Sequence, residues 1–315
     1  MKNNKLYVLA ILMVGFFSCQ QEKTEESSSA KQKPNIVVFL CDDLGYGDLS
    51  SYGHPMIQTP NLDGLAAKGI RMTNFYSAAL VCSPSRVGLM TGRSPNRAGI
   101  YDFIVGGHHP RPNNRDMVHM QAHEETIPQK LKSAGYATCL SGKWHCSSLF
   151  NDPEQQPTPD QFGFDHWFAT HNNAAPSHEN PNNFVRNGEE VGEIEGFSCQ
   201  IVVNEAMDWL GQQQKDQPFY LQVTFHEPHV PIASPPELVE KYRPYAQNDN
   251  QAQYFANVEN VDIAVGRLVQ YLEENGHDNT LIVFSSDNGP ETLLRYPRAQ
   301  HSYGTTDGLK GRKLW

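Results

Sequence analysis

The sequence has little positive charge for its length. The 315-residue chain carries 25 Lys and Arg residues against 35 Asp and Glu residues, a formal net charge of −10. This balance argues against a nucleic-acid partner, but it says little about the sign of a local pocket, so an anionic substrate is not excluded. Internal repeats are also lacking, and the composition is ordinarily globular. One large domain can therefore occupy nearly all of the chain.

The sequence also lacks an apolar run long enough to span a bilayer. The run at residues 6–17 is too short for a mature transmembrane helix, and it lies between a basic start and the pair Ser18-Cys19. This pattern predicts a signal peptide over residues 1–19, hence an exported protein of the periplasm, outer membrane or cell surface. A small residue before Cys resembles a bacterial lipoprotein cleavage site. Cys19 is therefore the lipidation candidate, and a lipid anchor is the only membrane contact we expect; the alternative is a plain signal peptide cut nearby.

Large apolar side chains are missing from residues 20–33, so we expect a flexible tether there and a folded domain over residues 34–315. Cysteine is scarce, with six residues in the chain. Cys41 lies in an apolar run, where a small buried hydrophobic residue is expected. Four cysteines allow three pairings, of which we predict none: Cys41, Cys139, Cys146 and Cys199.

From residue 34 onward, short apolar runs alternate with segments of helical periodicity. We expect strands at 35–41, 70–76, 136–140, 219–225 and 280–285, and helices at 62–68, 126–134 and 253–274. Residues 153–196 have weak periodicity and are interpreted as an insertion over the face that carries the site. The alternation predicts an α/β sandwich with a mostly parallel sheet, in which ligands gather beyond the carboxyl ends of the strands.

Acidic pairs follow two of the predicted strands. Asp42-Asp43 comes after the run at 35–41, and Asp287 with Asn288 follows the run at 280–285. Two carboxylates about 4 Å apart repel by roughly 4 kcal/mol at an effective dielectric near 20, and a cation would remove this penalty. Asp and Asn oxygens suit Ca²⁺ or Mg²⁺ better than zinc. For either pair alone, capping of the next turn is the more common explanation.

A reactive cysteine is predicted at the segment Cys82-Ser83-Pro84-Ser85-Arg86. Cys82 stands ahead of a helix that Pro84 starts, and we expect it to be exposed. The helix dipole and the nearby Arg86 would then lower the pKa of its thiol.

The pattern C-x-P-x-R at residues 82–86, followed by L-x-T-G-R at 89–93, resembles the signature of type I sulfatases of the alkaline phosphatase superfamily. Further segments resemble family landmarks in the same order: residues 42–45, 59–63, 142–145, 228–231 and 286–289. Residues 74–101 are most similar to the N-acetylgalactosamine-6-sulfatase and arylsulfatase group. The resemblance implies an alkaline-phosphatase-like sandwich with a large mixed sheet flanked by helices. It covers only part of a full sulfatase, so we expect an incomplete catalytic domain that lacks the carboxyl-terminal subdomain.

The resemblance also implies the site residues. The metal ligands would be Asp42, Asp43, Asp287, Asn288 and the modified Cys82, which a formylglycine-generating enzyme would oxidise during maturation. The metal would be Ca²⁺ rather than Mg²⁺. Positive or protonatable side chains would surround the sulfate group and stabilise its charge: Arg86, Lys143, His145, His229 and Lys313.

The implied activity is hydrolysis of sulfate esters, and we expect a sulfated carbohydrate as substrate. Hydrated formylglycine would attack sulfur in line, with the metal and Asp287 assisting removal of its proton, and form a covalent sulfate ester. His229, alone or with Lys313, would protonate the leaving alcohol, and His145 would then deprotonate the second hydroxyl to expel sulfate. His226 competes for the acid role, but the family pattern favours the histidine immediately before x-Pro, which is His229.

Two other functions compete with this one. A phosphatase or phosphonate monoester hydrolase of the same superfamily would share the sheet, although Cys82 and Asn288 favour a sulfatase. A non-catalytic glycan-binding relative would keep the fold and lose the chemistry, but every matched catalytic position is filled. Six further histidines could line a sugar subsite, although solvated loop positions are the more ordinary expectation: His108, His109, His119, His123, His171 and His178.

Overall fold

The computed structural model describes residues 32–105, 119–148, 154, 156–292, 294 and 297–315. The predicted signal peptide with Cys19, most of the predicted tether, and His108 and His109 lie outside the described residues. Among the described residues, no helix is both long enough and apolar enough to cross a bilayer.

A seven-stranded sheet organises the described part of the chain, in the order β5-β4-β3-β2-β6-β1-β7. Its strands are β1 (Asn35–Asp42), β2 (Ala137–Lys143), β3 (His166–Thr170), β4 (Val185–Arg186), β5 (Glu189–Glu190), β6 (Phe219–Pro228) and β7 (Thr280–Ser286). Strands β3, β2, β6, β1 and β7 are parallel, and β4 and β5 add an antiparallel edge. The predicted mixed, mostly parallel sheet is confirmed.

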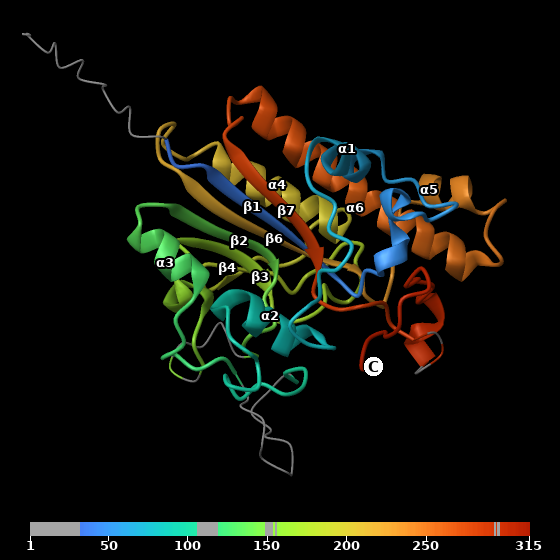
Figure 1. The fold of residues 1–315 in the computed structure, drawn as a ribbon, viewed down its shortest axis with the longest axis horizontal. Coiled ribbons are helices and arrows are strands. Elements are labelled where there is room, and N and C mark those ends of the chain that lie inside the picture. The colour runs from blue at the N-terminus through green and yellow to red at the C-terminus, as the bar shows by residue number, and fades with distance from the viewer. Residues whose placement is uncertain (1–31, 106–118, 149–153, 155, 293, 295–296) are drawn as a thin grey trace, which may run out of the picture. The chain divides into compact units, whose positions relative to one another are not determined.

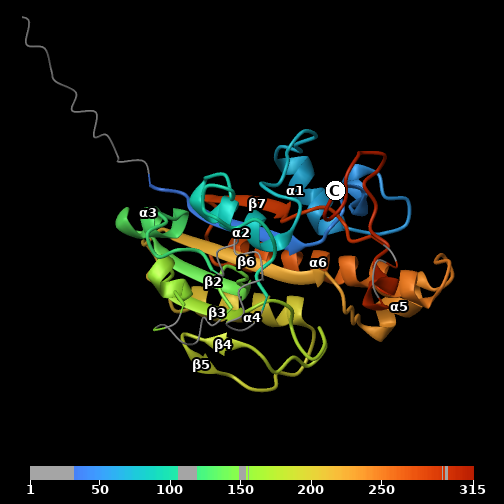
Figure 2. The ribbon, with the colours of Figure 1, turned by 90° about the horizontal axis from the view of Figure 1, so that it is seen from below.

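Helices cover both faces of this sheet (Figures 1 and 2). They are α1 (Pro60–Lys68), α2 (Cys82–Thr91), α3 (Ile127–Ser133), α4 (Ser198–Leu210), α5 (Pro236–Tyr242) and α6 (Asp249–Glu274). Within the described ranges, short 3₁₀ helices occupy Tyr46–Asp48, Ser50–Tyr52, Pro159–Phe162 and Pro297–His301. The predicted α/β sandwich is therefore present.

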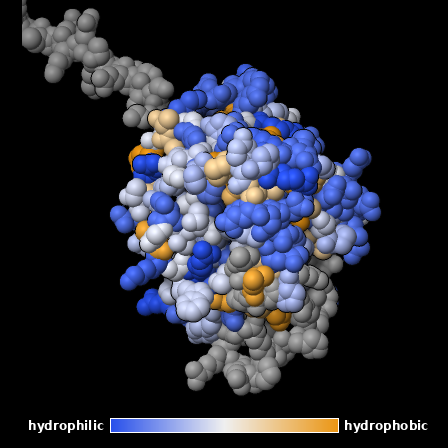
Figure 3. Space-filling model, turned by 90° about the vertical axis from the view of Figure 1, so that its right-hand side faces the viewer, coloured by the Kyte–Doolittle hydropathy of each residue, from blue (hydrophilic) through white to orange (hydrophobic). Residues whose placement is uncertain are grey.

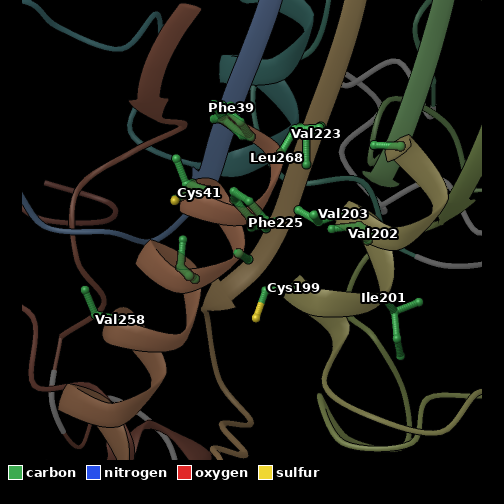
Figure 4. Packing of buried hydrophobic residues seen from close by; sticks show 14 of the residues in the cluster. Phe39, Cys41, Cys199, Ile201, Val202, Val203, Val223, Phe225, Val258 and Leu268 are labelled. Carbon is green, nitrogen blue, oxygen red and sulfur yellow. The ribbon is translucent and has the colours of Figure 1, made fainter. Parts of the chain in front are cut away.

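Two apolar cores lie on opposite faces of the sheet, because successive strand residues point to opposite sides. One core joins alternate residues of β1 and β6, such as Phe39 and Phe225, to Val203 of α4 and Leu268 of α6 (Figure 4). The second core includes Leu140 and Tyr220 on the other face, packed with residues of α2 and α3. The described cysteines are all buried and free, in agreement with the prediction of no disulfide.

Most of the predicted elements are confirmed, with boundaries that differ by a few residues. Strands β1, β2, β6 and β7 match the runs at 35–41, 136–140, 219–225 and 280–285. Helices α1 and α3 match 62–68 and 126–134, and α6 begins four residues before the predicted 253–274. Asn248 caps α6 by accepting from Gln251 N at 3.0 Å, a start signal that the apolar periodicity alone does not show.

The predicted strand at 70–76 is wrong. This segment has no strand hydrogen bonds, and its large apolar side chains are exposed, including Ile70 at 85% and Tyr76 at 79%. Residues 70–76 pair with no strand of the described sheet, whose order is β5-β4-β3-β2-β6-β1-β7. An apolar run needs such a partner to become a strand.

On the face seen in Figure 3, hydrophobic residues form separate small patches among hydrophilic ones.

Two other interpretations of the sequence need correction. Residues 153–196 are more than an insertion, because they contain β3, which pairs with β2 from Cys139–His166 to Lys143–Thr170. The short run from His166 to Thr170 was its signal. The continuous apolar run at 280–285, a pattern typical of strands buried on both faces, instead forms the edge strand β7, and Leu281 is 54% exposed.

Candidate active site

The two acidic pairs meet at the carboxyl edge of the sheet because β1 and β7 are parallel neighbours. Cys41 is in register with Ser286, so the residues that follow each strand lie side by side. The backbone N–H of Asp43 points to Asp287 Oδ1 at 3.4 Å, and Asn288 Nδ2 donates to Asp43 Oδ1 at 2.6 Å. Asp43 has a left-handed backbone, with φ of 64°, a strained conformation of the kind that concentrates at functional sites.

The amino terminus of α2 brings Cys82 and Arg86 to these carboxylates. Cys82 is the first residue of the helix, and its Sγ lies 3.3 Å from Asp42 Oδ1. Arg86 follows one turn later on the same face, where its Nε lies 2.9 Å from Asp287 Oδ2. One potential ligand atom each from Asp42, Asp43, Cys82 and His229 lies within 4.8 Å of all the others.

Each of the three carboxylates has its own cationic partner, and all six groups are buried. Lys143 contacts Asp42, Arg86 contacts Asp287, and Lys313 Nζ lies 2.8 Å from Asp43 Oδ2. Burial alone would raise the pKa of Asp42, but the charge of Lys143, with other cations nearby, outweighs it and holds that pKa well below the usual range. Burial, and next the charge of Asp42, raise the pKa of Asp287 to about 7.

Contrary to the sequence-based expectation, Cys82 is buried. It is 2% exposed, and burial, followed by the negative charge of Asp42, raises the pKa of its thiol. Arg86 does not offset this effect, because its guanidinium is turned to Asp287 and the Lys143 carbonyl. An unmodified Cys82 would therefore be a weak nucleophile in this environment, since the thiolate is the reactive form.

The oxygen atoms at this edge fit a hard cation. Asn288 Nδ2 donates to Asp43 Oδ1 and to the Gly289 carbonyl, while Asn288 Oδ1 is buried without a hydrogen-bond partner among the described residues. A buried amide oxygen without a donor, beside three carboxylates, is suited to a metal ion. Asp42, Asp43, Asp287 and Asn288 are the residues that could hold it.

Two of the candidate histidines have one ring nitrogen tied to a backbone carbonyl. His229 Nδ1 lies 2.6 Å from the Val230 carbonyl, and its Nε2 lies 3.6 Å from Asp43 Oδ2. Burial lowers the pKa of His229 to about 4, so the ring is neutral near pH 7. His145 Nε2 lies 2.9 Å from the Ile104 carbonyl, and its Nδ1 has no partner among the described residues.

His226 occupies a different environment from His229. Its Nε2 lies 2.8 Å from Thr170 Oγ1, and its ring packs edge-on against Phe184 in the interior. The structure therefore places His229, and not His226, among the acidic residues.

Comparison with known proteins identifies the family. The family model described as Sulfatase matches residues 34–308. The chain belongs to the sulfatase family. It is 34% identical to N-acetylgalactosamine-6-sulfatase of Homo sapiens over 294 residues, which cover 88% of this chain and 54% of that protein. It is 32% identical to arylsulfatase A of Homo sapiens over 284 residues, covering 82% and 53%. The chain thus spans about half the length of the curated relatives it matches.

A solved structure with a sugar ligand resembles this sulfatase chain as well. The crystal structure of Ps i-CgsB in complex with k-i-k-neocarrahexaose superposes with a TM-score of 0.74 at 29% identity, covering 90% of this chain and 62% of that one. The phosphonate monoester hydrolase of Agrobacterium radiobacter is a more distant neighbour, with a TM-score of 0.55 at 19% identity, which shows a shared fold only.

The expectation of solvated loop histidines is wrong for two of the residues that the sulfatase structure describes. His178 is fully buried, and half-buried His171 packs edge-on against His145, with ring centroids 5.3 Å apart. His123 is exposed, as expected, and half-buried His119 bonds the Met120 carbonyl. Sequence reasoning left His171 without a role because no motif surrounds it.

Sequence reasoning also missed Asp48, a buried carboxylate behind the acidic loop. Asp48 accepts hydrogen bonds from Gly45 N at 2.6 Å, the Tyr254 hydroxyl at 2.6 Å and Thr305 N at 2.8 Å. Burial raises its pKa to about 6. Asp48 thereby joins the loop after β1 to α6 and to the carboxyl-terminal segment that carries Lys313. Its proximity in sequence to Asp42-Asp43 was the available signal.

Proposed function

We propose that this chain is the catalytic region of a sulfuric ester hydrolase that removes sulfate from a sulfated carbohydrate. The observation that carries the proposal is the position of Cys82, at the start of α2 and 3.3 Å from Asp42 Oδ1, within a shell of buried cations. The raised pKa of its thiol supports a role for Cys82 as formylglycine rather than as a thiolate.

We assign the ion to Asp42, Asp43, Asp287 and Asn288, and we infer Ca²⁺ because the set is rich in carboxylate and amide oxygens. A bound divalent cation would supply positive charge next to the nucleophile and to one oxygen of the sulfate group. In its presence Lys143 and Lys313, which now neutralise Asp42 and Asp43, would be available to an anionic substrate. Arg86 would hold Asp287 in place.

The two candidate histidines have different roles in proton transfer: one donates a proton and the other accepts one. His229 keeps Nδ1–H on the Val230 carbonyl and presents Nε2 to the site, so the acid is the ring that has taken up a second proton on Nε2, and that proton passes to the leaving alcohol. His145 has a lone pair on Nδ1, because its Nε2–H is used by the Ile104 carbonyl, and so it can accept a proton. We propose His229, with Lys313 beside the same carboxylate, as the acid and His145 as the base.

The substrate class is supported by the relatives. One is named N-acetylgalactosamine-6-sulfatase, and another was crystallised with neocarrahexaose. A sulfated sugar of a glycosaminoglycan or algal polysaccharide is therefore our proposal. The test compares hydrolysis of an aryl sulfate, an aryl phosphate and a phosphonate monoester by one preparation, followed by a screen of sulfated oligosaccharides. A preference for phosphate or phosphonate would reject the sulfatase activity, and turnover of phenolic sulfates alone would reject the carbohydrate substrate.

We further propose that the protein is exported and lipidated at Cys19, and that a formylglycine-generating enzyme oxidises Cys82 before the chain folds. The burial of Cys82 supports this timing, because the folded protein hides the peptide that such an enzyme would read. Peptide mass spectrometry tests both modifications. A free thiol at Cys82 in an active preparation would refute the maturation step, and a mature amino terminus other than Cys19 would refute lipidation.

A further inference from the structure

The segment at residues 170–173, which is the last residue of β3 and the loop after it, contacts the surroundings of both proposed proton-transfer histidines. On one side, His145 N–H donates to the His171 carbonyl at 2.8 Å, and the two rings meet edge to face at an interplanar angle of 86°. On the other side, Asn173 Nδ2 donates to the Val230 carbonyl at 3.1 Å. The same carbonyl receives His229 Nδ1. One short loop therefore joins two residues that come from the ends of β2 and β6.

The Val230 carbonyl determines the tautomer of His229. A carbonyl oxygen only accepts hydrogen bonds, so the neutral ring must carry its proton on Nδ1 and leave the lone pair on Nε2. Asn173 donates to the second lone pair of the same oxygen and thereby holds it in place. Without Asn173, the oxygen that selects the tautomer would lose one of its two donors.

The ring of His171 limits the movement of His145. His171 is itself held by a hydrogen bond from Nδ1 to the Ser147 carbonyl at 2.8 Å, and its Nε2 has no partner among the described residues. Its edge-on contact restrains the His145 ring, whose Nε2–H donates to Ile104 on the opposite side of the imidazole from Nδ1. His145 also has a left-handed backbone, with φ of 53°, so its conformation depends on such neighbours.

We propose that Asn173 and His171 are positioning residues. Asn173 holds the carbonyl that keeps a proton on His229 Nδ1, so that Nε2 is the atom that gains and loses the transferred proton, and His171 holds the His145 ring in the orientation that leaves Nδ1 free to accept one. The proposal rests on the proposed function for the reaction that it serves, but its structural content can be tested without turnover. Neither residue needs to touch the substrate.

The structural test reads the tautomers by long-range ¹H–¹⁵N NMR of the ¹⁵N-labelled chain. We expect a single Nδ1–H form for His229 and a single Nε2–H form for His145. Asn173→Ala should give a mixture at His229 only, and His171→Phe should change the His145 signals only. Asn275→Ala is the matched control, because Asn275 Nδ2 also donates to a carbonyl, that of Tyr271, at the far end of α6. His277→Phe is the second control, because His277 also packs edge-on against a ring, that of Phe219.

The kinetic test separates the two histidines. If Asn173 positions the acid, Asn173→Ala should slow hydrolysis of a sugar sulfate about 10-fold more than hydrolysis of 4-nitrocatechol sulfate, because the leaving group of the latter needs little protonation. If His171 positions a base that acts after the alcohol has left, His171→Phe should lower kcat and KM together, also about 10-fold, and leave kcat/KM nearly unchanged.

Equal losses on both substrates with unchanged tautomers would overturn the proposal, because that pattern indicates a structural effect on folding alone. Inactivity of the wild-type chain toward every sulfate ester would count against the proposed function instead. In that case the NMR comparison still decides whether the two residues position the histidines.

Discussion

Two clusters of charge in this chain differ in their exposure to solvent. At the carboxyl edge of the sheet, the carboxylates of Asp42, Asp43 and Asp287 and their cationic partners are at most 6% exposed. On the outer part of the sheet, Glu205 binds Arg186 and His166, and the Arg186 side chain is 45% exposed. Both clusters consist of ion pairs, but only the first has been removed almost completely from water.

Because of this difference in exposure, we interpret the inner cluster as a site for chemistry and the outer cluster as a small contribution to stability. Burying an ion pair removes the hydration of both charges, and the attraction between the charges offsets this loss only in part. The inner cluster is therefore weak evidence of stability and stronger evidence of function. Solvent screens the charges of the outer cluster, so its effect on stability is small. The two clusters should therefore respond differently to mutation, to calcium and to pH.

The largest expected effect is the loss of turnover on replacing Cys82. Cys82→Ala removes the proposed nucleophile, so the rate should fall on the order of 10⁶-fold, while calcium still binds to the remaining carboxylates, if more weakly. Cys82→Ser should allow at most one turnover unless Ser is also converted. Cys139→Ala, at a buried position in β2, is the control and should keep activity. Full turnover by Cys82→Ala, measured with an aryl sulfate, would contradict the proposed mechanism.

In the metal-free protein, removing a cation from the inner cluster should destabilise the fold more than removing one from the outer cluster. Lys143→Met leaves Asp42 buried without its partner, so the free energy of unfolding should fall by about 3–5 kcal/mol. Arg186→Met removes a partly exposed partner of Glu205 and should cost only about 0.2–1 kcal/mol. Urea denaturation in the presence of EDTA measures both. Equal losses would show that burial does not distinguish the clusters.

Calcium should stabilise the inner cluster alone. At a free concentration about 100 times the dissociation constant, binding to the native state adds about 2.7 kcal/mol to the free energy of unfolding. The increase in Tm should appear in the wild type and in Glu205→Gln and be lost in Asp43→Asn. Differential scanning calorimetry with and without EGTA measures it. A full shift in Asp43→Asn would exclude Asp43 as a ligand.

The smallest effect concerns the pH dependence of the outer cluster. His166 and Arg186 overcome the burial of Glu205 and lower its pKa to about 2, below the ordinary value of 4.5. A depressed pKa stabilises the folded state above the unfolded pKa, and this contribution is lost as pH falls from about 4.5 to 2. The stability difference between the wild type and Glu205→Gln should therefore shrink over that window. A difference independent of pH would mean that Glu205 has no depressed pKa.

The sequence by itself determined that candidate metal-binding residues follow the carboxyl ends of two strands. The runs before Asp42 and Asp287 were apolar enough to predict β1 and β7, and the acids after them could lie only at a carboxyl edge. The segment from Cys82 to Arg86 likewise predicted a cysteine at the start of a helix with an arginine nearby, although the structure begins the helix at Cys82 rather than at Pro84. These conclusions needed only local patterns, because strand and helix periodicity are properties of consecutive residues.

Other features were decided by contacts between distant parts of the chain. Burial of Cys82, and with it the sign of its pKa shift, depends on Asp42 and on residues more than 50 positions away. Residues 70–76 stay outside the sheet because no described strand pairs with them, although their composition suits one. The loop at 170–173 has no motif, and it meets His145 and Val230 only because β2, β3 and β6 lie side by side. Hydrogen-bond partners and solvent exposure are set by the whole fold, so no local pattern contains them.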